Sequence, residues 1–181
     1  MLNLRAVRYT GAMASPNLHS FAPLAAPGAR ILILGNMPGV LSLQQQRYYA
    51  HPRNAFWPIT AELFGFDAAA PYDERVAALT GAGVAVWDVL GSCRRIGSLD
   101  SDVEPDSMAA NDFAAFYAAH PTIGHVFFNG AAAEKNYHRL VSVGHTPNFS
   151  RLPSTSPALT MRFEDKLTAW RAIHGVHRSA P

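Results

Sequence analysis

The chain has few of the side chains on which many enzyme mechanisms depend. Its 181 residues include one cysteine, Cys93, which excludes an internal disulfide and a cysteine-based zinc site. Its only two lysines, Lys135 and Lys166, do not follow a predicted strand, which disfavours Schiff-base chemistry. The eight histidines are scattered, and none pairs with a carboxylate at metal-binding spacing. We therefore expect no metal and no covalent amine intermediate.

Several nucleotide-binding and hydrolase motifs are also missing. The sequence has no Gly-x-x-x-x-Gly-Lys phosphate loop and no Gly-x-Gly-x-x-Gly dinucleotide fingerprint. It has no Gly-x-Ser-x-Gly elbow, which disfavours a serine hydrolase of the usual α/β type. These absences leave chemistry that works through neutral amides, hydroxyls and aromatic rings.

No apolar run approaches the roughly 20 residues that a transmembrane helix needs. The first residues show no continuous apolar segment and no clear cleavage site of a signal peptide. Hydrophobic residues make up 49% of the chain, which is typical of a globular protein and enough for one substantial core. We expect a single domain over residues 1–181 and a cytoplasmic protein.

Acidic residues are absent from two long segments, residues 1–61 and residues 135–163, although both contain arginines. If the two segments meet in the fold, they form a positive face that suits a phosphate backbone. The alternative is a chance distribution in a chain of net charge +2. Charge alone does not decide between these interpretations.

The hydrophobic pattern alternates between short strands and longer helices. Residues 1–28 carry Gly, Pro, Ala and Ser with weak periodicity and predict an N-terminal arm or loop. The expected strands are Ile31–Leu34, Val84–Trp87, His125–Phe128 and Phe149–Leu152. The expected helices are Ala55–Phe64, Asp112–His120, Ala131–Val141 and Leu159–His174. This order predicts an α/β fold with a mostly parallel central sheet.

A polar cluster follows each predicted strand: residues 36–39, Asp88, residues 129–130 and residues 154–156. In parallel α/β sheets, ligands bind beyond the carboxyl ends of the strands. The four clusters are therefore expected to gather at one edge of the sheet and to form one site.

The segment from residue 35 to residue 58 is the most informative part of the chain. It offers two asparagines, two tyrosines, a histidine, an arginine and further aromatics around a Gly-Pro turn. Such a set suits the cleavage of an N-glycosidic bond, which needs a positioned water, a grip on the leaving base and little acid–base power. An asparagine can hold water through its carbonyl oxygen and contact a base through its amide, and aromatic rings can stack on an extruded base.

These residues resemble the uracil-DNA glycosylase superfamily, and most of all its hypoxanthine-DNA (deoxyinosine) glycosylase branch. The resemblance covers residues from about 30 to 175. It rests on Gly35-Asn36-Met37-Pro38-Gly39 with Tyr48-Tyr49-Ala50-His51-Pro52-Arg53-Asn54-Ala55-Phe56-Trp57-Pro58, on Val86-Trp87-Asp88-Val89-Leu90 with Gly97-Ser98-Leu99-Asp100, and on Leu152-Pro153-Ser154-Thr155-Ser156-Pro157-Ala158. It implies a three-layer α/β/α sandwich, no cofactor, no metal, and removal of a deaminated base from DNA as its partner, leaving an abasic site. We expect such an enzyme to act as a monomer.

The resemblance also suggests which amide is catalytic. In the mismatch-uracil branch an asparagine positions the water at the place that Met37 occupies here. The hypoxanthine branch is thought to use the asparagine of its His-Pro-x-Asn segment, which is Asn54 in this chain. The alternative is that Asn54 has no catalytic role and only caps the helix that follows. Asn36 stands where this branch is expected to have serine, and it either contacts base or water or satisfies its turn.

The remaining candidates also have two interpretations each. Phe56 is expected to stack on the flipped base or to pack in the core, while Tyr49, Met37, Pro38 and Gly39 are candidates to line the base pocket. Asp88 and Asn129 either contact the base or cap local turns. The residues expected to contact DNA are His51, Arg53, Ser154, Thr155, Ser156 and Pro157.

Hypoxanthine is the expected base, because that branch matches over the whole first motif. A uracil or mismatch-uracil glycosylase is the rival within the enzyme class. A module that binds damaged or single-stranded DNA without cleaving it is the rival from another class. A nucleoside hydrolase is the third alternative, and it would not need the acid-free segments.

Overall fold

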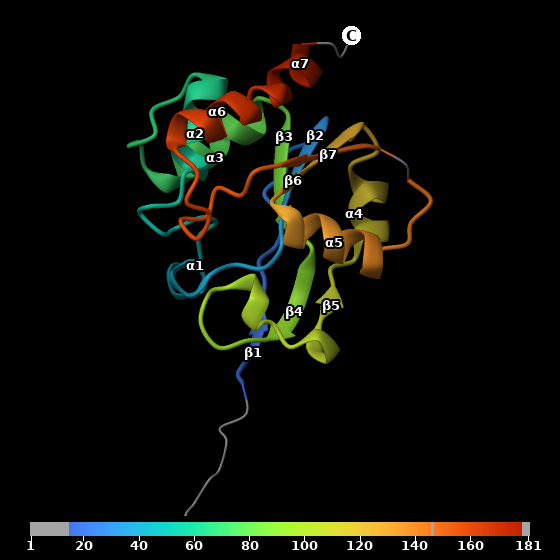
Figure 1. Cartoon of the computed structure of the whole chain (residues 1–181). Coiled ribbons are helices and arrows are strands. Elements are labelled where there is room, and N and C mark those ends of the chain that lie inside the picture. Colours follow the sequence, from blue (N-terminus) through green and yellow to red (C-terminus); the bar gives the residue numbers. More distant parts are fainter. Residues whose placement is uncertain (1–14, 146, 179–181) are drawn as a thin grey trace, which may run out of the picture.

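The computed structural model describes residues 15–145 and 147–178, and its centre is a four-stranded parallel sheet (Figure 1). The strand order is β3-β2-β6-β7, formed by Val84–Asp88, Ile31–Gly35, His125–Asn129 and Asn148–Leu152. All residues of β2 and β3 are buried, as expected for strands with near-continuous apolar sequence and helices on both faces. The four predicted strands are confirmed, each to within one residue at either end.

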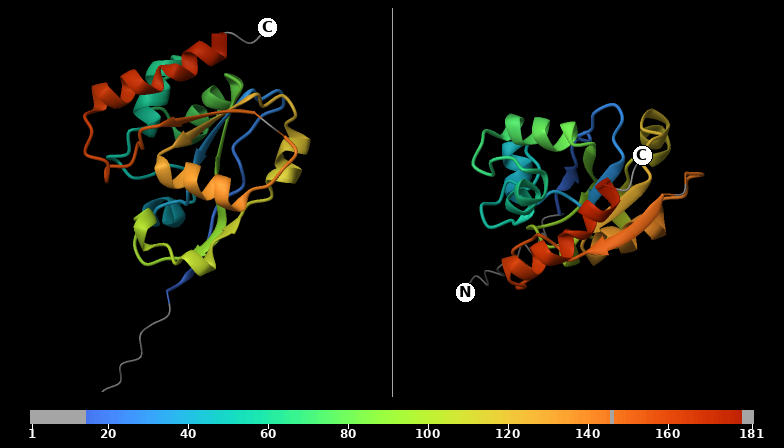
Figure 2. Two further views of the ribbon diagram at one scale, coloured as in Figure 1. Left: turned by 45° about the vertical axis from the view of Figure 1, so that its right-hand side comes forward. Right: turned by 90° about the horizontal axis from the view of Figure 1, so that it is seen from above.

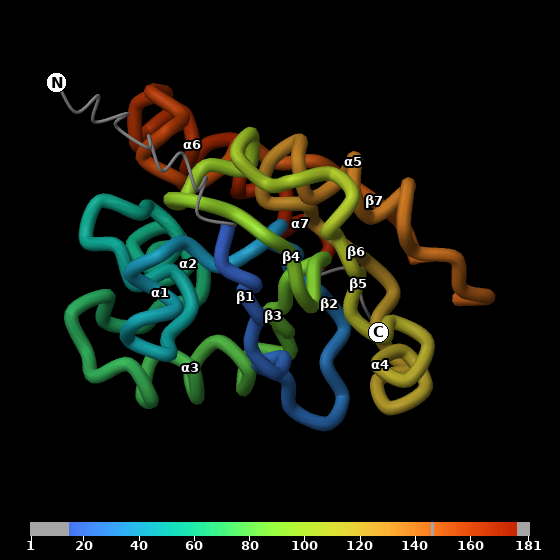
Figure 3. Tube along the Cα trace, turned by 90° about the horizontal axis from the view of Figure 1, so that it is seen from below, coloured from blue at the N-terminus to red at the C-terminus, as the bar shows by residue number. Residues whose placement is uncertain are grey.

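Helices cover both faces of this sheet (Figures 1 and 2). One side carries α2, α3 and α6, which span Phe56–Phe64, Tyr72–Gly81 and Phe163–Trp170. The other side carries α4, Phe113–Ala119, and α5, Ala131–Leu140. Figure 3, seen from below, shows α2 and α3 on one side of the molecule and α4 on the other. The predicted α/β fold with a mostly parallel sheet between helical layers is therefore confirmed.

A small antiparallel sheet lies below the main one and was not predicted. Its strands β1, β4 and β5 span Asn17–His19, Leu90–Arg94 and Ala109–Ala110, in the order β1-β4-β5. Two short 3-10 turns, Asp100–Asp102 and Pro105–Ser107, lie between β4 and β5. The prediction failed here because these strands are short and β4 follows β3 after a single residue, Val89.

Of the predicted N-terminal arm or loop over residues 1–28, residues 1–14 lie outside the described part, and residues 15–28 are mostly loop but include the short strand β1. From Asn17 onward the chain pairs with β4, and Leu24 forms an antiparallel bridge with Val86. The Trp87 indole N–H donates to the Phe21 carbonyl at 3.0 Å. Apolar side chains in a Gly- and Pro-rich segment thus anchor it to the sheet despite its weak periodicity.

The predicted C-terminal helix Leu159–His174 is also corrected. Helix α6 begins only at Phe163, and a second helix, α7, follows as Ala172–Arg178. Arg162 pairs with Asp165 at the start of α6, where acidic side chains favour the helix dipole. Helix α1, Val40–Gln45, and helix α3 were not predicted at all. Within residues 15–145 and 147–178, no helix combines the length and apolarity needed to cross a membrane.

Candidate active site

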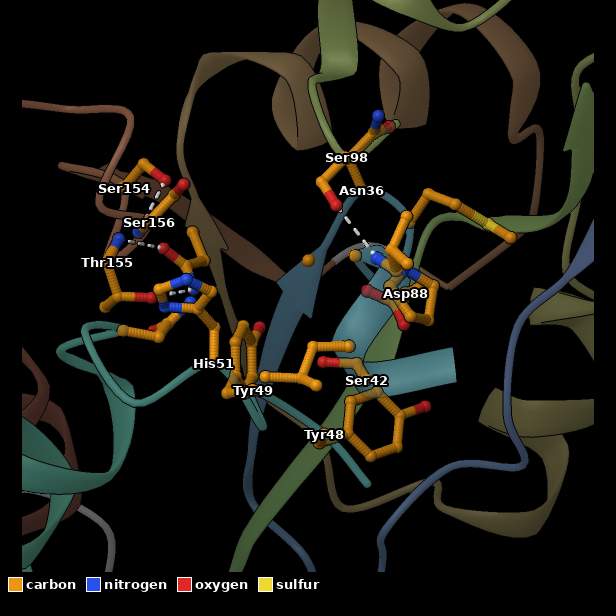
Figure 4. Close-up of a pocket in the computed structure, with 18 of the residues that line it drawn as sticks. Asn36, Ser42, Tyr48, Tyr49, His51, Asp88, Ser98, Ser154, Thr155 and Ser156 are labelled. Carbon is orange, nitrogen blue, oxygen red and sulfur yellow. Dashed lines mark hydrogen bonds between the residues drawn. The ribbon is translucent and has the colours of Figure 1, made fainter. Parts of the chain in front are cut away.

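A cavity of about 330 Å³ opens at the carboxyl edge of the parallel sheet (Figure 4). It is lined by residues from all four predicted strand-end clusters, so the structure brings them together as expected. In Figure 4 the Ser154–Ser156 turn and His51 lie on one side, and Ser98, Asn36 and Asp88 lie on the other. The lining also includes Met37, Pro38, Gly39, Tyr48, Tyr49, Asn54, Asp100, Asn129 and Pro157.

The end of β2 approaches the cavity wall so closely that only glycine fits there. A Cβ on Gly35 would overlap the Asp88 carboxylate oxygen Oδ1 and lie 3.0 Å from the Tyr49 hydroxyl. The β2–β3 register places Gly35 directly beside Asp88. The absence of a side chain at Gly35 therefore leaves room for the Asp88 carboxyl group and the Tyr49 hydroxyl at the base of the cavity.

Asp88 is an isolated buried acid at this position. The residue is 3% exposed, and no described residue hydrogen-bonds to its Oδ2. Burial, and next the neighbouring Asp100, raise the pKa of its carboxyl group to about 8, while Arg95 opposes the shift. A carboxyl group with this pKa is mostly protonated at neutral pH, so Asp88 presents a hydrogen-bond donor as well as an acceptor.

Asn36 is a buried residue that links the buried Asn136 to the more exposed Asp100. Its amide nitrogen donates to Asp100 Oδ1 at 2.7 Å, and its carbonyl oxygen accepts from the Asn136 amide at 2.8 Å. Both halves of the Asn36 amide are therefore held by protein groups, which fixes its orientation at the cavity. Sequence reasoning assigned no role to Asn136 or Asp100. Asn136 is the sixth residue of α5 and follows Glu134 and Lys135, and nothing in this pattern distinguishes it.

The loop that follows β2, residues 36–39, is held by hydrogen bonds with the segment that follows β4. Arg95 directly follows β4. Its side chain is completely buried and donates to the carbonyl of Pro38 at 2.5 Å. Ser98 accepts a hydrogen bond from the backbone N–H of Val40 at 2.9 Å. These contacts fix the backbone of Met37, Pro38 and Gly39, the residues predicted to shape the pocket.

Asn54 lies at the entrance of α2 and lines the cavity. Its side-chain oxygen accepts a hydrogen bond from the backbone N–H of Phe56 at 3.0 Å. The structure assigns the N-cap position to Ala55, so the predicted cap is displaced by one residue. A carbonyl oxygen has two lone pairs, and this bond uses one of them. The Asn54 side chain is thus oriented and still able to accept a second hydrogen bond.

Phe56 does not line the cavity, which corrects the expectation that it stacks on a flipped base. Its side chain is completely buried. The Tyr49 ring covers it, stacked at 3.9 Å between centroids with 19° between the planes. Tyr49 has a left-handed backbone, with φ of 54°, which is uncommon outside glycine. An aromatic base in the cavity would therefore meet Tyr49, with Phe56 as the layer beneath.

Asn129 and Thr155 form a two-point clamp across the strand ends. The Asn129 amide donates to Thr155 Oγ1 at 2.9 Å and accepts from the Thr155 backbone N–H at 2.8 Å. Asn129 therefore does not cap α5, whose N-cap is Gly130. Thr155 is completely buried, so its side chain does not reach a DNA phosphate as predicted. Both residues position the Ser154–Ser156 turn.

The other predicted DNA contacts differ in their placement. Ser154, Ser156, Pro157 and His51 line the cavity. Arg53 is exposed and lies outside the cavity lining. Its placement is compatible with a contact to DNA beyond the cavity, but not with a contact to the base.

The two acid-free segments do meet, because the backbone N–H of Ala55 donates to the Thr155 carbonyl at 3.0 Å. Only part of their positive charge lies there. Arg30 precedes β2 and is therefore at the opposite edge of the sheet, and Arg151 and Arg162 pair with acids. Arg5 and Arg8 lie outside the described residues. The expected positive face is thus smaller than the sequence suggested.

In the described ranges, no three His, Cys, Asp or Glu side chains come together in a group that could hold a metal ion. The cavity lining contains no lysine. What the arrangement offers is two oriented amides, a neutral carboxyl group, a stacked aromatic pair and a turn of serines. This set fits hydrolysis of a bond to a flat heterocycle.

The family model of the uracil DNA glycosylase superfamily matches residues 22–174. The chain belongs to this superfamily. It is a DNA glycosylase, an enzyme that hydrolyses N-glycosyl bonds. The range that matches the family model contains every lining residue of the cavity as well as the sheet.

Similar proteins come from two Methanosarcina species. A hypoxanthine DNA glycosylase of Methanosarcina barkeri is 28% identical over 151 residues, which covers 83% of this chain and 93% of that protein. A hypoxanthine DNA glycosylase of Methanosarcina acetivorans is 28% identical over 154 residues, covering 84% and 95%. The solution structure of a candidate uracil DNA glycosylase from Methanosarcina acetivorans superposes with a TM-score of 0.77, at 27% identity, covering 90% of this chain and 99% of that one.

Proposed function

We propose that this glycosylase removes a deaminated base from DNA, with hypoxanthine as its first substrate, and so starts base excision repair. The observation that carries the proposal is the cavity-facing Asn54, whose oxygen is oriented by the Phe56 N–H and has a lone pair left for water. Two relatives that match most of the chain are named hypoxanthine DNA glycosylases, which supports the choice of base.

The reaction begins when the target nucleotide leaves the stack and its base enters the cavity. The base stacks on Tyr49, and its polar edge faces the strand-end side chains. Water bound to the Asn54 oxygen attacks the sugar C1′ as the bond from C1′ to the base breaks. The bonding electrons leave with the base, and an abasic site remains. The cavity lining contains no lysine, so the chain is monofunctional and leaves the DNA backbone intact.

The DNA around the flipped nucleotide meets the mouth of the cavity. Ser154 and Ser156 offer hydroxyl donors to phosphates, and the exposed Arg53 offers a positive charge.

Uracil is the second candidate substrate. The family and the solved relative both carry its name, and uracil shares with hypoxanthine an N–H group next to a carbonyl. The cavity volume of about 330 Å³ is at the small end of ligand pockets and admits either base.

Duplexes that each carry one hypoxanthine, uracil or xanthine test this proposal, with strand nicking after alkali as the readout. The wild type is expected to act on hypoxanthine fastest, and an undamaged duplex is the control. Cleavage at uracil alone would keep the glycosylase but replace its substrate. Binding without cleavage of any duplex would favour a damage-binding module.

A further inference from the structure

Asp88 is a buried acid beside the cavity whose carboxyl group is not fully hydrogen-bonded. It lies at the end of β3, lines the cavity, and has one oxygen without a hydrogen-bond partner among the described residues. The Tyr49 hydroxyl is also buried and unpaired there. Two unpaired buried polar groups at one place are costly, and such groups are often retained because a ligand completes them.

The surroundings of Asp88 favour its neutral form. The charged and titratable groups that face it are Asp100, Arg95, Tyr48 and Tyr49. Arg95 is the single cation among them, and its hydrogen bonds go to the carbonyls of Pro38 and Gly97. No ion pair joins Arg95 to Asp88 within residues 15–145 and 147–178. Burial and the negative Asp100 therefore prevail over the attraction of the arginine.

We infer that Asp88 acts as a neutral acid that donates a hydrogen bond from the cavity wall to the departing base. This role rests on the proposed function and gives Asp88 a second task beyond contact with the base. Deaminated bases share a ring N–H next to a carbonyl group. A neutral carboxyl group can donate to that carbonyl and accept from that N–H, whereas a carboxylate can only accept.

The proton balance of the step is complete with these groups and solvent. When the bond between C1′ and the base breaks, its electron pair goes to the base, and the Asp88 proton moves to an oxygen or nitrogen of that base. The water oxygen bonds to C1′, the proton that this water loses passes to solvent, and solvent returns a proton to the Asp88 carboxylate. The sum is one water consumed, one abasic sugar and one neutral free base.

The position of Gly35 supports the same role. Its missing side chain lets the Asp88 oxygen lie against the end of β2, beside the Tyr49 hydroxyl. The carboxyl group is thereby held at the floor of the cavity, next to the ring on which the base stacks. A group placed there faces the cavity in which the base would lie.

The test is the single-turnover excision rate of wild type and Asp88→Asn between pH 6 and 9.5, on the duplex that the wild type cleaves. The wild-type rate is expected to fall above pH 8, approaching tenfold per pH unit. Asp88→Asn keeps a hydrogen-bond donor but transfers no proton. Its rate at pH 7 is expected to be about 100-fold lower, within the usual range for loss of an acid catalyst, and to stay flat above pH 8.

Two further variants separate catalysis from structure. Asp100→Asn removes the negative charge beside Asp88, so its alkaline midpoint is expected about one unit lower. Asp106→Asn, at an exposed position in the same connection, is expected to follow the wild-type profile. A falling alkaline limb that persists in Asp88→Asn overturns the inference, as does a wild-type rate that rises through pH 8. Absence of excision by wild type at every pH instead refutes the proposed function.

Discussion

The side-chain oxygen of Asn54 accepts a hydrogen bond from the backbone N–H of Phe56 at 3.0 Å. The bond orients the amide at the start of α2, and the residue lines the cavity at the same time. The two roles considered for Asn54 from its sequence position, holding water and satisfying the helix start, are therefore compatible in one geometry.

Asn54→Ala is expected to lower the excision rate by about 100-fold or more, since a positioned group of this kind contributes on that scale. It also leaves the Phe56 N–H without its partner, which costs about 1 kcal/mol of stability. Asn148→Ala, at an exposed asparagine at the start of β7, is the matched control. Single-turnover rates and urea unfolding measure the two effects. A folded Asn54→Ala protein with wild-type rate would remove Asn54 from the mechanism.

Tyr49 and Phe56 are expected to differ in what their loss affects. Phe56→Ala empties a completely buried site and should cost about 3–5 kcal/mol of unfolding free energy. Tyr49→Leu keeps an apolar side chain but removes the ring that faces the cavity. Its expected effect is weaker binding of the flipped base, by about 1–3 kcal/mol, seen as a higher KM. If Phe56→Leu raised KM more than Tyr49→Leu, a base would be stacking on Phe56 after all.

The clamp between Asn129 and Thr155 gives a third prediction. Asn129→Ala removes both of its hydrogen bonds and leaves the buried Thr155 N–H unpaired, so it should destabilise the fold by about 2–3 kcal/mol. Thr155→Val removes only the hydroxyl acceptor and should cost less. Both changes loosen the Ser154–Ser156 turn and are expected to weaken DNA binding, measured by fluorescence anisotropy. Unchanged stability in Asn129→Ala would contradict the clamp.

Asp88 also gives the protein a stability that depends on pH. Its folded pKa of about 8 lies above the ordinary value of 3.8, so the folded state holds one more proton between these values. Wild-type stability should therefore fall as pH rises from about 4 to 8.

Asp88→Asn removes this titration, because an amide does not ionise. Compared with wild type, the variant should become relatively more stable by at least about 1.4 kcal/mol between pH 5 and pH 8, the equivalent of one pKa unit. Urea unfolding at pH 5, 6.5 and 8 measures the difference, and the exposed Asp106→Asn should stay parallel to wild type. A constant difference between Asp88→Asn and wild type would mean that Asp88 titrates in the ordinary acidic range.

The parallel sheet could be predicted because its strands are short, continuous apolar runs bounded by turn residues. The same pattern placed the four polar clusters at one edge, since the carboxyl ends of parallel strands meet there. The antiparallel sheet could not be predicted, because β1 and β5 are too short to show a period. Their pairing depends on contacts with β4, which local sequence does not reveal.

Side-chain orientation was the second limit. The motif around Phe56 contains several aromatic residues, and sequence does not tell which ring faces the cavity. The left-handed backbone of Tyr49 turns that ring over Phe56, an arrangement set by tertiary packing. The hydrogen bond between Asn36 and Asn136, which are a hundred residues apart in the sequence, could not be predicted either. Asp88, by contrast, could be chosen from its place directly after a buried strand.

The most direct test of the account is the release of free base from a hypoxanthine-containing duplex, followed by chromatography for wild type and Asn54→Ala at equal concentrations. The wild type is expected to release hypoxanthine stoichiometrically and leave an intact abasic strand, and the folded variant is expected to release the base about 100-fold more slowly. Equal release by both proteins, or no release by the wild type while it binds the duplex, would contradict the proposed role of Asn54 and the proposed function, respectively.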